Sequence, residues 1–248
     1  MTARQRVDTL LVERGLAETR SKAQALVMAG AVWSGERRLD KPGAMVAADL
    51  PIELRGRDHP WVSRGGVKLA HGLRHFAIDP ADAVALDIGA STGGFTDVLL
   101  TGGARRVYAV DVGYGQLAPK LREDPRVVVL ERLNARHLTR TQIPEPVDLI
   151  VCDASFIGLA VVLPAALALA APGARLVALI KPQFEVGKGR VGKGGVVRDP
   201  ALRREACNAV AAWLGAQPGW TVDGVAESPI TGPEGNVEFL LAAHREAS

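Results

Sequence analysis

The chain has 248 residues, of which 48% are hydrophobic and 23% charged, a size that suits one α/β domain with a small additional module. The formal net charge of +3 permits a nucleic-acid partner without requiring one. Cys152 and Cys207 lie far apart, so they indicate neither a zinc site nor a disulfide framework. The chain starts without the apolar stretch of a signal peptide, and its longest apolar run, 157–171, is too short to span a bilayer. We therefore expect a soluble, cytoplasmic protein without a bound metal.

Residues 1–58 are expected to form a separate α+β module. Apolar spacing predicts a short helix around 7–11 and a second helix over 22–29, with Thr19 or Ser21 as its cap. Short β-type segments are predicted at 31–34, 37–39 and 49–54. Four basic side chains gather around the two helices: Arg4, Arg6, Arg20 and Lys22. By charge alone, such a grouping is more typical of a solvated surface than of an RNA-binding site.

A linker is expected over 59–64, where charged residues, Gly and Pro replace the apolar pattern. Trp61 within it fits either packing between modules or simple core burial. A helix is predicted over 66–75, with Ser63 as its cap and Lys68 in its first turn. The helix dipole disfavours a lysine there, so Lys68 needs a carboxylate or another anionic partner.

A β-α-β unit is predicted over 83–111. Its first strand, 83–86, is followed by Asp87 and a glycine-rich turn, and its second strand, 107–110, is followed by Asp111. In such units the ligand binds at the carboxyl ends of the strands, where Asp111 can accept hydrogen bonds from ribose hydroxyls. The turn has the spacing D-x-G-x-x-x-G instead of the dinucleotide pattern G-x-G-x-x-G. A nucleoside-type cofactor is therefore expected.

Further strands are predicted along the rest of the chain, at 127–130, 147–152, 176–180, 220–226 and 237–242. A buried helix is predicted over 157–171, with Pro164 as a flaw in it, and another helix over 202–214. The segment 182–199 is rich in glycine and basic residues and has no clear secondary structure. It is expected to be either a mobile lid over an anionic substrate or a disordered surface insert.

Four ionisable residues fall at informative positions: Lys68 on the entry helix, and Asp153, Lys181 and Glu238 at strand ends. Strand ends of a doubly wound sheet meet at one edge, so these side chains are expected to converge. A lysine in such a group can take a proton from a substrate hydroxyl only when the lysine itself is neutral. A lysine with an ordinary pKa near 10.4 reaches its neutral form at pH 7 at a cost of about 4.6 kcal/mol, so its environment must favour that form.

Several strings identify the chain by resemblance. The glycine-rich turn resembles the first motif of class I S-adenosylmethionine-dependent methyltransferases, and the four ionisable residues resemble the K-D-K-E tetrad of FtsJ-like ribose 2′-O-methyltransferases. The N-terminal pattern around R-S-K-A resembles the RNA-binding module of the ribosomal-protein-S4 type. Longer strings, including V-S-R-G-G-V-K-L, D-I-G-A-S-T-G-G-F-T-D, K-P-Q-F-E-V-G-K-G and G-N-V-E-F, resemble the TlyA family.

The resemblance implies a class I, Rossmann-like methyltransferase sheet with helices on both faces and an antiparallel last strand, over 65–248. It implies transfer of a methyl group from S-adenosylmethionine to the ribose 2′-hydroxyl of cytidine in ribosomal RNA, of the large subunit and in some members also of the small subunit. Lys68, Asp153, Lys181 and Glu238 are then the catalytic residues, with Lys181 as the base.

By the same resemblance, the cofactor-binding residues are Asp87, Gly89, Ala90, Ser91, Thr92, Gly93, Gly94, Phe95, Asp111, Val112, Asn134 and Asp153. The RNA-binding residues are expected to be Arg4, Arg6, Arg20, Lys22 and Arg64, and, in the basic segment 182–199, Lys188, Arg190 and Lys193. One departure is the linker, which reads His59-Pro60-Trp61-Val62 where characterised members resemble R-x-W-V, so no conformational role is assigned to the linker.

Three other functions compete with this one. The family carries a haemolysin label, but no spanning segment or strongly amphipathic basic helix supports a membrane-active protein. Base methylation is the second, but an amino-directed enzyme usually shows an N/D-P-P-Y/F motif where this chain reads D-A-S-F. Carbon-5 chemistry needs a cysteine nucleophile, and the apolar neighbours of Cys152, Ile150 and Val151, favour an inward-facing strand residue instead. The third is an RNA-binding assembly factor without catalytic activity. The sequence predicts no oligomeric state.

Overall fold

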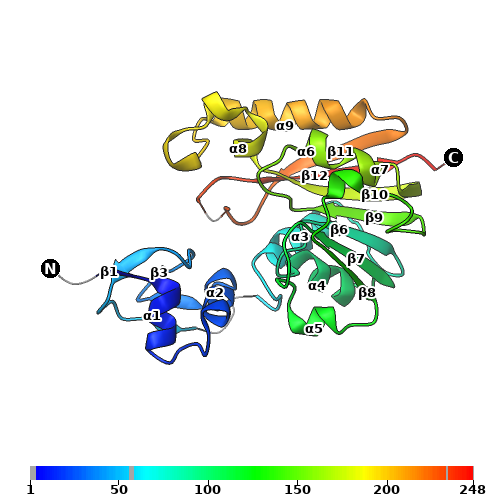
Figure 1. The fold of residues 1–248 in the computed structure, drawn as a ribbon. Helices are drawn as coiled ribbons and strands as arrows, with labels where there is room; N and C mark the ends of the chain where they lie inside the picture. Colours follow the sequence, from blue (N-terminus) through cyan, green and yellow to red (C-terminus); the bar gives the residue numbers. More distant parts are fainter. Residues whose placement is uncertain (1–3, 56–58, 233, 248) are drawn as a thin grey trace. The chain divides into compact units, whose positions relative to one another are not determined.

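The computed structural model describes residues 4–55, 59–232 and 234–247. The chain divides into two compact units, Met1–Arg64 and Gly65–Ser248 (Figure 1). Residues 59–64, which we expected to link the modules, belong to the first unit by their contacts. The expected module end at residue 58 lies outside the described residues.

The first unit packs two helices against short strands. Its helices are α1 (Val7–Glu13) and α2 (Arg20–Met28), and the Thr19 side chain caps α2 by accepting from the Lys22 amide. One antiparallel pair joins β1 (Arg4–Arg6) to β4 (Met45–Ala47), and a second small sheet has the order β3 (Arg37–Arg38), β2 (Val32–Ser34), β5 (Glu53–Leu54). The core consists of apolar side chains from both helices and from β2 and the segment after β3: Val7, Leu11, Ala23, Val27, Val32 and Leu39.

A seven-stranded sheet forms the second unit, in the order β11-β12-β10-β9-β6-β7-β8. Its strands are β6 (Val84–Ile88), β7 (Arg106–Asp111), β8 (Val127–Glu131), β9 (Val147–Cys152), β10 (Ala170–Ile180), β11 (Trp220–Glu227) and β12 (Phe239–Arg245). Strands β8, β7, β6, β9 and β10 pair in parallel, and β12 runs antiparallel to both of its neighbours. The predicted class I sheet with an antiparallel last strand is therefore confirmed.

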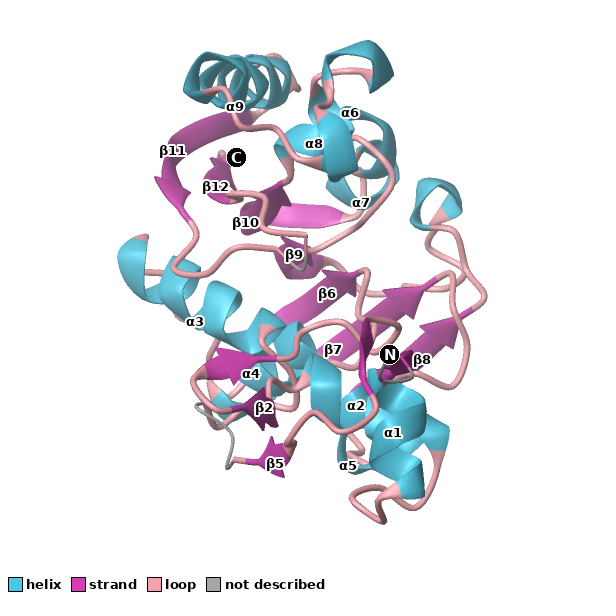
Figure 2. Cartoon of the chain, turned by 90° about the vertical axis from the view of Figure 1, so that its left-hand side faces the viewer, coloured by secondary structure: helices cyan, strands magenta, loops and turns pink. Residues whose placement is uncertain are grey.

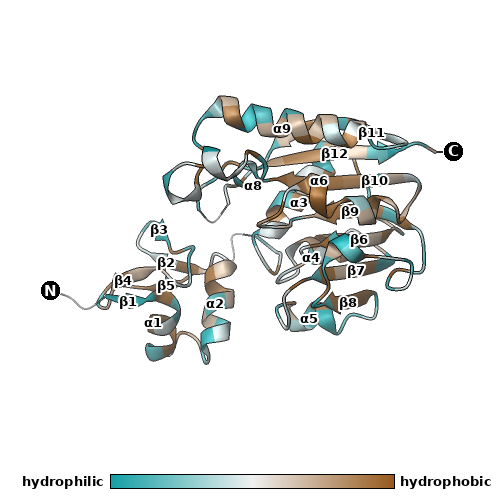
Figure 3. Ribbon diagram, turned by 45° about the horizontal axis from the view of Figure 1, so that its top comes forward, coloured by the Kyte–Doolittle hydropathy of each residue, from teal (hydrophilic) through white to brown (hydrophobic). Residues whose placement is uncertain are grey.

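Helices cover both faces of this sheet, as predicted (Figure 2). One face carries α3 (Gly65–His75) and α4 (Gly94–Thr101), with the short α5 (Pro119–Arg122) beside β8. The other face carries α6 (Leu159–Val162), α7 (Pro164–Leu167) and α9 (Pro200–Gly215). The strands between these layers are largely apolar (Figure 3), because a parallel sheet buried on both faces needs apolar side chains on both.

The prediction of one buried helix over 157–171 is wrong. Pro164 is the first residue of α7, so it divides the segment into two short helices, and Ala170 already belongs to β10. Proline lacks the amide hydrogen that a continuous helix would need there. A continuous apolar run also fits a buried strand as well as a buried helix, which explains why the start of β10 was missed.

The segment 182–199 is more ordered than the sequence indicated. It contains α8 (Pro182–Glu185) and two 3₁₀ turns, Lys188–Arg190 and Lys193–Gly195. Val186 and Val197 pack with Ala206 of α9. The expectation of a segment without secondary structure is therefore wrong, because its few apolar residues anchor it on α9.

Candidate active site

The glycine-rich turn after β6 is shaped by two left-handed glycines. Gly89 has a φ of +80° and Gly93 a φ of +95°, a region that side chains disfavour. A Cβ on Gly89 would lie 3.0 Å from the carbonyl oxygen of Asp153, so only glycine lets the turn approach the segment after β9 this closely. A Cβ on Gly93 would collide with the Leu121 and Leu117 side chains.

Asp111 at the end of β7 fixes this turn. Its Oδ2 accepts from the Ser91 amide at 2.8 Å, and its Oδ1 accepts from the Gly113 amide at 2.7 Å. Each carboxylate oxygen has a second lone pair, so both can accept a further hydrogen bond. Asp111 therefore combines a structural role with the capacity to accept from a pair of hydroxyls.

Asp87 lies in β6 and is fully buried. Its Oδ2 accepts from the Thr96 hydroxyl at 2.6 Å, and its Oδ1 has no hydrogen-bond partner among the described residues. Burial raises the pKa of Asp87 to about 7; the Thr96 hydrogen bond opposes this rise, and the charges of Asp153 and Asp111 add to it. The buried Asp87 thus joins β6 to α4 through Thr96 and lies close enough to Asp153 and Asp111 to be affected by their charges.

The other predicted cofactor residues surround this turn. Ala90 and Phe95 are buried, Thr92 accepts from the Ala118 amide through its carbonyl oxygen, and Gly94 is the first residue of α4. Val112 is 70% exposed. The Asn134 side chain caps the 3₁₀ helix η1 (Ala135–His137). The preceding residue, Leu133, donates its main-chain amide to the Asp111 carbonyl oxygen. These residues belong to one edge of the sheet, while their contact with a cofactor stays a prediction.

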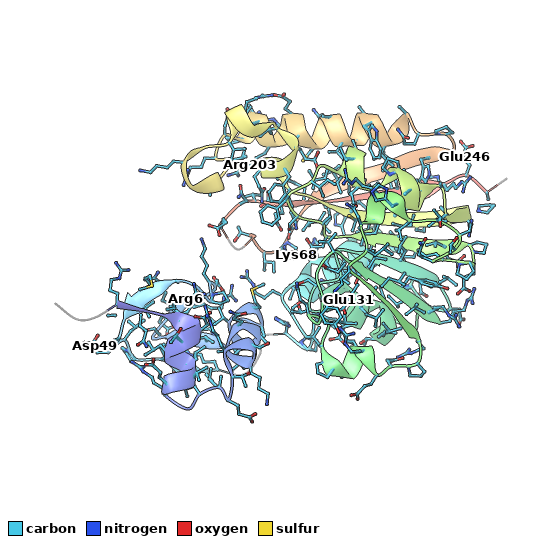
Figure 4. The ribbon with its side chains drawn as sticks, in the orientation of Figure 1. Arg6, Asp49, Lys68, Glu131, Arg203 and Glu246 are labelled. Carbon is cyan, nitrogen blue, oxygen red and sulfur yellow. The ribbon has the colours of Figure 1, made fainter. Side chains whose placement is uncertain are left out.

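Lys68 and Glu238 form a buried ion pair. The Lys68 Nζ donates to Glu238 Oε2 at 2.6 Å, and the two side chains are 9% and 1% exposed. This contact confirms that a lysine in the first turn of α3, labelled in Figure 4, has a carboxylate partner. Glu238 immediately precedes β12, which begins two residues later than predicted. A Cβ on Gly232 would collide with the Glu238 carboxylate, so Gly232 leaves space for it.

Lys181 and Asp153 form a second ion pair at the ends of β10 and β9. The Lys181 Nζ lies 2.6 Å from Asp153 Oδ1, which makes no hydrogen bond in the described part of the chain, so this contact is ionic. The same Nζ donates to the Ser155 hydroxyl at 2.8 Å and to the Asp153 carbonyl at 3.2 Å. Sequence reasoning missed Ser155, although its position two residues after Asp153 was the available signal.

Strand register brings these pairs and the glycine turn to the same sheet edge. Ile180 pairs with Phe239, so Lys181 and Glu238 are the next residues on their two antiparallel strands. Ile88 pairs with Cys152, and the Asp153 amide donates to the Ile88 carbonyl at 2.9 Å. Of the four predicted catalytic residues, Asp153, Lys181 and Glu238 thus lie at the carboxyl edge of the parallel strands, and Lys68 lies in the first turn of α3.

Two further residues at this edge were missed. Phe156 is 90% exposed with a φ of +66°, and its ring centroid lies 5.2 Å from that of Phe184. Glu185 accepts from the Leu159 amide at 2.9 Å, and burial raises its pKa. Glu185 thereby links the segment after β10 to the segment after β9. Neither a left-handed phenylalanine nor this link leaves a signal in the sequence.

The predicted RNA-binding residues differ in their partners. In the first unit, Arg4 donates to the Met45 carbonyl, Arg6 and Arg20 pair with Asp8, Lys22 pairs with Glu18, and Arg64 pairs with Asp40. In the second unit, Arg190 pairs with Glu205 of α9 and Lys193 is exposed. The side chain of Lys188 lies outside the described parts.

The fold and this edge define a class I methyltransferase domain. The FtsJ-like methyltransferase family model matches residues 61–245, and the S4 domain model matches residues 5–50. The chain is 52% identical to the 16S/23S rRNA (cytidine-2′-O)-methyltransferase TlyA of Mycobacterium tuberculosis, over 97% of this chain and 90% of that protein. It is 38% identical to Hemolysin A of Brachyspira hyodysenteriae, over 95% of this chain and 98% of that one.

Solved structures agree. A hemolysin-named protein from Streptococcus thermophilus superposes with a TM-score of 0.77 at 41% identity, covering 100% of this chain and 90% of the other. An O-methyltransferase from Bacillus cereus in complex with SAH has a TM-score of 0.52 at 21% identity. The match covers 74% of this chain and 82% of the other, and shows a shared fold alone. The chain belongs to the TlyA family of FtsJ-like methyltransferases.

Proposed function

We propose that this protein transfers a methyl group from S-adenosylmethionine to the ribose 2′-hydroxyl of cytidine in ribosomal RNA. The observation that carries the proposal is the pair of lysine–carboxylate contacts, Lys181–Asp153 and Lys68–Glu238, placed by the same sheet edge as the glycine turn. Large-subunit RNA is the proposed substrate, and small-subunit RNA is a further candidate. The first unit binds the RNA, and the protein acts in the cytoplasm, where ribosomal RNA is found.

The glycine turn and the acidic residues around it would hold the cofactor. Asp111 keeps acceptor capacity for the ribose hydroxyls, and Gly89 and Gly93 leave the turn free of side chains. Asp87 is buried in the strand that leads into the turn, and its Thr96 contact holds the start of α4 in place. When bound, S-adenosylmethionine supplies an electrophilic methyl group on its sulfonium.

Lys181 is the candidate that accepts the proton of the attacking hydroxyl. Asp153 and Ser155 fix its Nζ at the end of β10, which gives the nitrogen a defined position relative to an incoming ribose. Lys68, held by Glu238, places a positive charge on this edge, where it stabilises the negative charge that develops on the ribose oxygen. The exposed ring of Phe156 offers a face on which a nucleotide base can stack.

Carbon-5 base methylation is disfavoured by Cys152. The thiol is fully buried in β9, and burial raises its pKa to about 12. A buried protonated thiol is a poor nucleophile, and such chemistry needs a thiolate. For the membrane-active alternative, none of the helices in the described part of the chain is long and apolar enough to span a bilayer.

The proposal is tested by incubating the purified protein with tritiated S-adenosylmethionine and, separately, unmodified large and small ribosomal subunits. We expect label in large-subunit RNA. The Lys181→Ala variant should transfer no methyl group and should bind S-adenosylhomocysteine within a few-fold of the wild type, because Lys181 acts on the attacking hydroxyl. Absence of label in both subunits, with cofactor binding intact, would favour an RNA-binding factor without activity.

A further inference from the structure

Asp8 is a fully buried carboxylate in the first turn of α1 and collects donors from several elements. Its Oδ1 and Oδ2 accept from Arg6 Nε at 2.9 Å and from Arg6 Nη2 at 2.8 Å. Its Oδ2 also accepts from Arg20 Nε at 3.0 Å and from Gln24 Nε2 at 3.0 Å. Asp8 thus joins the strand β1, which carries Arg6, to the helix α2, which carries Arg20.

The two arginines are fixed on one side and open on the other. Their side chains are 42% and 58% exposed, whereas that of Asp8 is 0% exposed. A guanidinium has five N–H donors in a rigid fork. Arg6 engages two of its nitrogens and Arg20 one in contacts with Asp8, so donors remain on both groups for an external anion.

The fold also leaves room for the Arg6 fork. Main-chain hydrogen bonds from Val7 to Ala44 at 3.0 Å and from Asp8 to Pro42 at 2.9 Å hold the segment around Gly43. A Cβ on Gly43 would lie 3.0 Å from Arg6 Nη1 and 3.1 Å from Nη2. The guanidinium therefore packs against a glycine whose position is fixed by the start of α1.

We propose that Asp8 is a positioning residue for RNA binding, which holds the Arg6 and Arg20 guanidiniums as a rigid pair that contacts RNA phosphates. The inference rests on the RNA-binding role proposed for the first unit. A rigid guanidinium loses less conformational freedom on binding a phosphate than a flexible one. This gain must exceed the electrostatic loss, because Asp8 lowers the charge of the three-residue group from +2 to +1.

The alternative is a purely structural role, in which Asp8 only stabilises the fold. An acidic residue suits the first turn of a helix, and ion pairs with arginines are common. The hydrogen bond from Arg6, with those from Gln24 and Arg20, holds the pKa of Asp8 well below its usual range, so the carboxylate is charged in either case. The two roles are separated by RNA affinity, not by stability.

Asp8→Asn and Glu13→Gln provide a matched comparison. Both remove one negative charge from α1, but Glu13 is exposed and forms no ion pair with Arg6 or Arg20 among the described residues. Attraction to RNA by net charge alone predicts tighter binding by both variants. The positioning role predicts that Asp8→Asn binds about tenfold more weakly, since the loss of two aligned phosphate contacts is worth about that factor or more, while Glu13→Gln binds as well as the wild type or better.

Binding of the full-length protein to purified, unmodified large-subunit ribosomal RNA should be measured over a series of salt concentrations. The slope of log K against log salt should lose about 1 to 2 in magnitude for Asp8→Asn and stay unchanged for Glu13→Gln. Equal or tighter binding by a folded Asp8→Asn protein would overturn the inference. Absence of wild-type binding would instead overturn the proposed RNA-binding function.

A second variant covers the case in which Asp8→Asn does not fold. Gly43→Val leaves every charge in place and adds a side chain where the Arg6 guanidinium packs. We expect it to weaken RNA binding several-fold with an unchanged circular dichroism spectrum and unchanged binding of S-adenosylhomocysteine. Wild-type RNA affinity in that variant, with the fold intact, would show that the Arg6 position is irrelevant and would equally overturn the inference.

Discussion

Each lysine at the sheet edge has its own carboxylate, and the two pairs differ in surroundings. Lys68 and Glu238 are both buried, whereas Asp153 is 21% exposed beside Lys181. A buried ion pair adds little net stability, but removal of one partner leaves an uncompensated buried charge. The Lys68–Glu238 pair therefore makes the fold sensitive to single substitutions for reasons unrelated to catalysis, and its two roles need separate measurements.

We expect Glu238→Ala to lower the free energy of unfolding by about 3–5 kcal/mol, because it strands the Lys68 ammonium in the protein interior. The double variant Lys68→Met with Glu238→Leu should recover most of that loss in urea unfolding, since it removes both charges and keeps the volume. Neither variant should transfer a methyl group. A double variant as unstable as Glu238→Ala would contradict this account of the pair.

Asp87 makes stability depend on pH. Its pKa is raised to about 7 in the folded protein, against an ordinary value of about 3.9. Because the folded state holds the proton more tightly, the stabilising contribution of this group is fully present below about pH 4 and is lost as the pH rises through about 7. Asp87→Asn should be more stable than the wild type at pH 8, with a difference that shrinks toward pH 5. Urea unfolding at both pH values checks this, and a difference that grows toward acid pH would refute it.

The sequence predicted the regular elements better than the connections between them. Strand β9 and the sheet edge followed from apolar runs that end in Asp153 or Lys181, because burial on both faces leaves a clear pattern. Strands β1 and β4 are three residues each and were missed, since so short a segment shows no alternation. The partners of Lys181 beyond Asp153 depend on how the chain turns after β9, which spacing does not reveal.

Asn236 connects two elements that bear on the site. The side chain of Asn236 is buried. Its Oδ1 accepts from the main-chain amide of Val197 at 2.9 Å, and its Nδ2 donates to the Gly195 carbonyl oxygen at 2.8 Å. It thereby ties the basic segment 182–199 to the segment that leads into Glu238. This tie and the contact of Val197 with α9 explain why the segment is packed in place.

We expect Asn236→Ala to lower stability by about 1–3 kcal/mol, because it leaves two main-chain groups without partners. Amide hydrogen exchange in 191–197 should accelerate, and the KM for ribosomal RNA should rise more than kcat falls. Asn236→Asp keeps the acceptor for Val197 but loses the donor to Gly195, so its exchange rate should lie between those of the wild type and Asn236→Ala. Unchanged exchange in Asn236→Ala would show that other contacts hold the segment.

At the scale of the whole molecule, the chain joins a small RNA-binding module to a methyltransferase domain, and each has its own hydrophobic core. In the first unit, Arg6 and Arg20 share the buried carboxylate of Asp8, and in the second unit two lysine–carboxylate pairs lie at the sheet edge. The proposed division of labour follows from this contrast. Exposed arginines suit phosphate contacts, and buried lysines with fixed partners suit proton transfer and charge stabilisation.

The central claim is that the methyl group goes to a ribose 2′-hydroxyl, and alkaline hydrolysis of the labelled RNA tests it most directly. The 2′-hydroxyl is the nucleophile that cleaves RNA in alkali, so a methyl group on it protects the adjacent phosphodiester bond. After transfer from tritiated S-adenosylmethionine to large-subunit RNA, we predict that the label survives in alkali-resistant dinucleotides whose 5′ nucleoside is 2′-O-methylcytidine. Label recovered entirely in single nucleotides would place the methyl group on a base and contradict the account.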